Sequence, residues 1–136
     1  MFSELEIDRI GRAFAAGALP KSEWTHAAHF AVAVWMLDRG GDAFAEMPAL
    51  IRAYNTGDGT PNTDQSGYHE TITFASLRCA AMFLRGPRTR GEALGALLAS
   101  RYGRSDWLLD YWTRDRLFSP QARRTWIEPD VKALPF

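Results

Sequence analysis

The stretch from His26 to Leu37 is apolar around nearly its whole circumference, and this feature most constrains how the chain can fold. Ser22 or Thr25 is suited to cap a helix at its start, and Gly40-Gly41 ends it. A helix that is apolar on every side has to be buried among other helices. The sequence therefore predicts a central helix, whose two histidines are expected to lie away from open solvent.

The remaining segments show helical spacing and no sustained alternation of apolar and polar residues, which predicts an all-α bundle of five to seven helices in one domain, 1–136. Ser3 and Glu6 form a capping box for the first helix. Pro48 is expected to interrupt the helix that begins at Asp42. Further helices are expected over 68–85 and 90–101, from 105 through 112 and over 120–126, before an extended tail.

Composition narrows the classes of function. The 16 basic and 16 acidic residues give a formal charge of zero, which argues against a surface built to hold nucleic acid. The longest apolar run, Phe30 to Leu37, is far shorter than the ~20 residues of a membrane helix. A neutral molecule also tends to self-associate, so a homodimer is expected. The lone Cys79 excludes an intramolecular disulfide and favours a reducing compartment, the cytoplasm.

All three histidines fall in two short clusters, 24–29 and 67–71. His26 and His29 share one helix face at a spacing of three, and His69 opens another helix. Three imidazoles on one ion leave a coordination position for water or substrate, which is the pattern of catalytic sites. We therefore expect a divalent transition metal (Zn, Fe, Cu or Ni) in a small metal-dependent enzyme. The ligands leave hydrolysis and oxygen chemistry equally open.

Residues around His69 extend this candidate site. Glu70 is expected to move protons beside the metal, with the hydroxyl of Tyr68 within reach. The long loop from Thr56 to Gly67 leads directly to this cluster, and loops of that length are commonly functional. Helix starts and burial both lower the pKa of histidine and keep the ring neutral. The groups expected to contact a small-molecule substrate are Asn62, Thr63, Asp64 and Thr73.

Two alternatives remain open. In the first, the histidines bind a small polar ligand directly, without a metal. In the second, they only cap helices, and the protein is an interaction module whose partner surface contains Trp107, Trp112 and a cluster of arginines. For that cluster, salt bridges to neighbouring acids are favoured over an anion clamp. The arginines are Arg114, Arg116, Arg123 and Arg124, and the acids are Asp106, Asp110, Asp115 and Glu128.

Five short sequence motifs, in a fixed order, resemble those of an uncharacterised family of small bacterial all-helical proteins. The resemblance covers nearly the whole chain and implies the helical fold and which residues belong together; it implies no reaction. This chain differs from the family pattern in its extended loop over 56–67. The motifs are Trp24-Thr25-His26-x-x-His29, Tyr68-His69-Glu70-Thr71-Ile72-Thr73, Leu117-Phe118-Ser119-Pro120-x-Ala122-Arg123, Pro129-Asp130 and Leu134-Pro135.

Overall fold

The computed structural model describes residues 2–136, and within them the chain forms seven α-helices, three short 3-10 turns and no strand. The predicted all-α bundle is thereby confirmed. The α-helices are α1 (Glu4–Ala15), α2 (His26–Asp38), α3 (Ala43–Gly57), α4 (Glu70–Phe83), α5 (Arg90–Ala99), α6 (Arg114–Leu117) and α7 (Pro120–Arg124). The 3-10 turns are η1 (Lys21–Glu23), η2 (Arg101–Gly103) and η3 (Trp107–Asp110).

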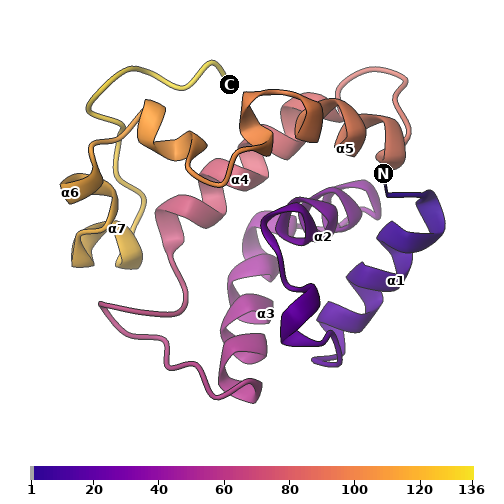
Figure 1. The fold of residues 1–136 in the computed structure, drawn as a ribbon, viewed down its shortest axis with the longest axis horizontal. Coiled ribbons are helices and arrows are strands. Elements are labelled where there is room, and N and C mark those ends of the chain that lie inside the picture. Colours follow the sequence, from indigo (N-terminus) through magenta and orange to yellow (C-terminus); the bar gives the residue numbers. More distant parts are fainter. Residues whose placement is uncertain (1) are drawn as a thin grey trace.

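Helix α2 is the centre of the fold and packs against α1, α3, α4 and α5 (Figure 1). The hydroxyl of Thr25 caps it by accepting a hydrogen bond from the amide of Ala28. Every residue from Phe30 to Met36 is buried, as a helix without a polar face requires. Helix α1 approaches it closely, because a Cβ placed on Gly11 would lie 2.1 Å from an indole carbon of Trp35.

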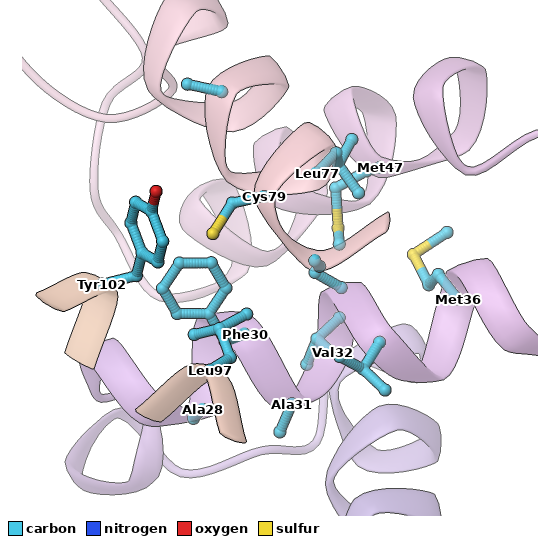
Figure 2. Packing of buried hydrophobic residues seen from close by; sticks show 14 of the residues in the cluster. Ala28, Phe30, Ala31, Val32, Met36, Met47, Leu77, Cys79, Leu97 and Tyr102 are labelled. Atoms are coloured by element: carbon cyan, nitrogen blue, oxygen red, sulfur yellow. The ribbon is translucent and has the colours of Figure 1, made fainter. Parts of the chain in front are cut away.

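Side chains from four helices meet in one hydrophobic core (Figure 2). Val32 comes from α2, Met47 from α3, Leu77 and Cys79 from α4, and Leu97 from α5. Burial raises the pKa of the Cys79 thiol to about 12, so it remains a neutral thiol at physiological pH.

Two predicted details of the helices were wrong. Helix α3 runs unbroken through Pro48, although proline lacks the N–H that the helix would use. The Asp42 cap and the burial of Met47 and Tyr54 on its inner face offset that loss. The helix expected from Ser105 is instead the turn η3 followed by the short α6, because no side chain caps its start.

The segment after α7 is irregular, as predicted for the tail, and is fastened to the bundle by hydrogen bonds. The indole N–H of Trp112 donates to the carbonyl of Ile127 at 3.2 Å, and the amide of Val131 donates to the carbonyl of Tyr111 at 2.9 Å. No helix within 2–136 has both the length and the apolar character that crossing a membrane requires.

Candidate functional site

The amino-terminal ends of α2 and α4 lie close together and bring two of the three histidines to one cavity. This cavity measures about 370 Å³, and both His29 and His69 line it. His26 lines an adjoining cavity of about 270 Å³, to which His29 and Ile72 also contribute. A narrow pocket of about 50 Å³ is again lined by His29 and Ile72. We call these three hollows, which share His29 and Ile72 in their walls, the His29 groove.

His29 is the histidine best placed for chemistry. Its Nδ1 lies 2.7 Å from the carbonyl oxygen of Thr25, and because a carbonyl only accepts, Nδ1 carries the proton. Nε2 therefore keeps its lone pair in the neutral ring, and no group within 2–136 is hydrogen-bonded to it. The ring stacks on Trp24 with 3.7 Å between centroids. It is open to solvent through the groove.

Electrostatics favour the neutral form of this ring. Although solvent reaches His29, protein surrounds it on most sides, and this desolvation lowers its pKa below the ordinary value of 6.5. The hydrogen bond to the Thr25 carbonyl opposes the shift, and the neighbouring His26 adds to it. At neutral pH the groove thus contains an unprotonated imidazole nitrogen that can accept a hydrogen bond or a proton.

His69 has a different role, since both of its ring nitrogens are occupied. Nε2 donates to the carbonyl of Leu117 at 2.7 Å, and Nδ1 accepts from the amide of Ile72 at 3.1 Å. The residue caps α4 and ties it to the end of α6. Burial, with the charge of Arg123 as a lesser contribution, lowers its pKa to about 4, although the bond to Leu117 opposes the shift.

One ring nitrogen of His26 is also occupied by a hydrogen bond. Its Nε2 donates to the carbonyl of Tyr102 at 2.9 Å, and its ring packs edge-on against Phe30. A shared ion would require His69 to give up a hydrogen bond that fastens α4. Among residues 2–136, no group of three or more histidine, cysteine, aspartate or glutamate side chains is arranged to hold a metal ion.

Tyr68 and Glu70, the expected catalytic pair, are bonded to each other. The hydroxyl of Tyr68 donates to Oε1 of Glu70 at 2.6 Å, and the guanidinium of Arg52 lies 4.2 Å from the centre of the Tyr68 ring. Burial and, to a smaller extent, the Glu70 carboxylate raise the pKa of Tyr68 far above its usual value. The phenol therefore stays protonated and directs its proton at Glu70.

The loop between α3 and α4 is held by its own side chains. Oδ1 of Asn62 accepts from the amide of Tyr68 at 2.9 Å, and its Nδ2 donates to the carbonyl of Arg52 at 3.1 Å. Gly67 has a φ of 78°, and a Cβ there would lie 2.4 Å from the carbonyl oxygen of Pro61, so only glycine fits. This loop positions the Tyr68-His69 cluster at the groove.

The residues predicted to contact a ligand lie near the groove, and most are engaged within the protein. Asn62, Thr63 and Asp64 line a small cavity of about 140 Å³, which shares Tyr68 and Arg123 with the groove. Thr63 bonds to Ser66, and Asp64 forms an ion pair with Arg124. Thr73 lines the groove itself, and its hydroxyl donates to the carbonyl of His69 at 2.8 Å.

The walls of the groove combine apolar rings with a few charges. The apolar side chains are Trp24, Ile51, Tyr54 and Ile72. Lys21 and Asp58 form an ion pair at 2.9 Å, and Arg123 completes the charged groups. Sequence patterns missed Lys21 and Ile51 as site residues, since nothing in their local sequence distinguishes them from surface or core positions. Arg123 was considered there as part of an anion clamp, and salt bridges were favoured instead.

In the carboxy-terminal third, one alternative and one expectation were wrong. Trp107 and Trp112 are fully buried at 0% exposure, so the alternative in which they form a partner surface does not hold. The arginines do not pair with the neighbouring acids. Arg124 binds Asp64 instead, and the acid Asp110 binds Arg104. A separate cavity of about 300 Å³ lies under the carboxy-terminal tail, and no histidine lines it.

Comparisons of the chain with protein-family models, with curated proteins and with solved structures gave no match. The function is therefore argued from the geometry of the His29 groove alone.

Proposed function

We propose that the protein is a small-molecule-binding module whose ligand occupies the His29 groove and hydrogen-bonds directly to His29. One observation carries this proposal: Nε2 of His29 is an acceptor without a protein partner in 2–136, and His29 lines a cavity of about 370 Å³. Ligand sites are typically concave and mostly apolar, with a few polar groups that fix orientation. The groove has this composition.

The walls indicate the kind of molecule that fits. Trp24, Tyr54 and Ile72 offer flat or branched apolar surfaces, which favour a ring or a short hydrocarbon body. Because Nε2 of His29 accepts, the ligand has to present a donor such as a hydroxyl or an N–H. The proposed ligand is therefore a small cyclic molecule with a hydrogen-bond donor on its edge.

A metal-dependent enzyme at His26, His29 and His69 stays a prediction beside this proposal. It is tested by the metal content of protein purified without a histidine tag. A stoichiometric metal that is lost alike in His26→Ala, His29→Ala and His69→Ala would replace our proposal. Because both ring nitrogens of His69 are hydrogen-bonded, we expect no stoichiometric metal.

The same proposal extends to location and partners. We propose that the protein acts in the cytoplasm, because its one cysteine is a free, buried thiol. Nucleic acid is an unfavourable partner, because a formal charge of zero gives little attraction to a phosphate backbone. Self-association into a homodimer stays a prediction, which sedimentation velocity tests directly.

The decisive experiment compares phenol with anisole, which share the ring and differ in the donor. Binding is followed by NMR, from the chemical shift of the indole N–H of Trp24, which lines the same cavity and is present in the wild type and in His29→Phe. Phenylalanine keeps the ring that stacks on Trp24 and removes the acceptor. Phenol is expected to bind about fivefold more tightly than anisole to the wild type and equally to the variant.

The control is His26→Phe, which removes an imidazole from the adjoining cavity and leaves Nε2 of His29 in place. This variant is expected to keep the preference for phenol. If the wild type binds neither probe at millimolar concentration, or if His29→Phe keeps the preference, the proposed function is wrong.

A further inference from the structure

We infer that the end of the His29 groove beside Arg123 is an oxyanion subsite, so that the ligand is an organic anion with a carboxylate or phosphate group. This inference rests on the proposed function, because it assumes that the groove takes a small molecule. It adds the charge of that molecule and names the residue that recognises it.

Arg123 is unusual among the basic residues of this protein. Within 2–136, every lysine and arginine is exposed except Arg90 and Arg123, which are half-buried. Arg90 is paired with Glu4 at 3.0 Å and with Asp38 at 3.7 Å. No carboxylate of the described chain lies within 4.0 Å of Arg123. A guanidinium that is partly withdrawn from water is stabilised by a counter-ion, so Arg123 is available to an anionic ligand.

The protein uses little of the hydrogen-bonding capacity of Arg123. Its Nη1 donates to the carbonyl of Gly67 at 3.3 Å, which is a long bond to a neutral acceptor. A guanidinium has five N–H donors, and those of Arg123 that lack a partner are not enclosed by protein. Most other arginines without a carboxylate lie over aromatic rings, such as Arg39 on Trp35. The two that do not are exposed, Arg85 and Arg116. In the described chain, Arg123 has no such ring.

The charges around Arg123 leave a local positive excess. Arg124 is neutralised by Asp64, and Lys21 by Asp58. Arg52 lines the same small cavity of about 140 Å³ as Arg123, lies over the ring of Tyr68, and has no carboxylate within 4.0 Å in 2–136.

Two cations thus face this cavity without a counter-ion from the described chain. The nearby Glu70 carboxylate accepts from the Tyr68 hydroxyl and does not line the cavity. A planar guanidinium matches a carboxylate or a phosphate with two parallel hydrogen bonds, which gives both affinity and orientation. Because Arg123 lines both the groove and the small cavity, an anion held there belongs to a molecule whose body extends toward His29.

The test varies only the charge of the probe. Para-hydroxybenzoate and the longer para-hydroxyphenylpropionate are each compared with their neutral amides, and para-hydroxyphenyl phosphate represents the phosphate class. All share the donor expected to face His29. Affinities are measured by titration calorimetry at pH 7.5 with the wild type. We expect at least one of the anions to bind about tenfold or more tightly than its neutral amide, or than para-hydroxybenzamide for the phosphate.

Three variants assign the effect to a residue. Arg123→Gln is expected to abolish the preference for anions, and Arg123→Lys to restore part of it. Arg85→Gln removes the same charge from an exposed arginine beyond the other end of α4 and is expected to change nothing. The phosphate and carboxylate arms show which oxyanion the subsite prefers.

The outcomes separate this inference from the proposed function. If amides and anions bind equally, and both are weakened in His29→Phe, the oxyanion subsite is wrong and the proposed function stands. If anions are preferred and Arg123→Gln keeps that preference, the assignment to Arg123 is wrong. If anion binding depends on Arg123 and is unaffected in His29→Phe, the proposed function fails. If no probe binds, both proposals fall.

Discussion

The role of His69 as a neutral, doubly bonded cap predicts a specific loss of stability in acid. Burial lowers its pKa to about 4 in the folded protein, against 6.5 in an unfolded chain. Between these two values the unfolded chain binds more protons than the native state, so the free energy of unfolding falls as the pH falls. The contribution is complete above pH 6.5 and is lost progressively down to about pH 4.

The magnitude follows from the two pKa values. The difference between 6.5 and about 4, at 1.36 kcal/mol per pH unit, corresponds to about 3 kcal/mol. His69 is only 6% exposed, so solvent screening reduces this figure little. A loss of that size is a large part of the ~5–15 kcal/mol that stabilises a typical domain. Aspartates with lowered pKa values, such as Asp8 and Asp130, add their own losses at lower pH.

A matched variant isolates the histidine from those carboxylates. His69→Asn keeps a residue suited to cap α4, lacks a titrating group, and leaves the carbonyl of Leu117 without its donor. At pH 7.5 the variant is expected to be less stable by about 1–3 kcal/mol. Near pH 4 the difference is expected to vanish or reverse, because only the wild type has lost stability through this residue.

Urea unfolding followed by tryptophan fluorescence, at a series of pH values between 7.5 and 4, measures both proteins directly. An NMR titration of the wild-type imidazole gives the native pKa independently. A difference in stability that stays constant across this pH range, or a native pKa near 6.5, would refute the assignment of His69 as a neutral cap.

Four further predictions follow from the structure. Gly11→Ala is expected to lower stability by about 1–3 kcal/mol, measured as a fall in melting temperature, because the new methyl group meets Trp35. Thr71→Val is expected to cost about 1–3 kcal/mol in the same assay, since the single hydroxyl proton of this fully buried residue is shared between the carbonyls of Ala122 and Thr125; an unchanged melting temperature would contradict that geometry. Cys79 is expected to react with iodoacetamide only in denaturant, as followed by mass spectrometry. Binding of phenol is expected to weaken in acid, because the pKa of His29 is lowered from 6.5 and only its neutral form accepts; an affinity that stays constant while NMR shows His29 becoming protonated would oppose this.

The sequence predicted the parts of this fold that depend on composition. The helix over 26–37 is apolar on nearly every side and can only be stable when it is buried among other helices. Helix α2 is accordingly the central helix of the fold. The meeting of the two histidine clusters was also predicted, and His29 and His69 do line one cavity. Pro48 shows the limit of local rules, because tertiary burial of α3 offset a residue that usually breaks helices.

The partners of the site residues depend on contacts between distant segments, which local patterns do not contain. The carbonyl that binds His69 is 48 residues away, and the one that binds His26 is 76 residues away. The acid that neutralises Arg124 is 60 residues distant, whereas the sequence-based pairing used acids nearby in the chain. The sequence-based pairing also assigned a nearby acid to Arg123, which has no carboxylate within 4.0 Å in the described chain. Local sequence thus indicates which residues gather at a site and does not indicate which of their atoms remain free.

The three histidines make the same kind of hydrogen bond, but its effect differs among them. Each donates one ring N–H to a backbone carbonyl. In 2–136 the carbonyls of Tyr102 and Leu117 have no other donor, so His26 and His69 satisfy groups that would otherwise lack a partner.

The carbonyl of Thr25 already accepts the helical bond from the amide of His29 at 3.0 Å, so the imidazole is not needed to satisfy it. The bond instead fixes the ring and its tautomer, as a supporting hydrogen bond does for a functional histidine. A stack on Trp24 alone would be served equally well by phenylalanine. A histidine held in one orientation, with one ring nitrogen free in 2–136 and a cavity beside it, is explained by a ligand that donates to it.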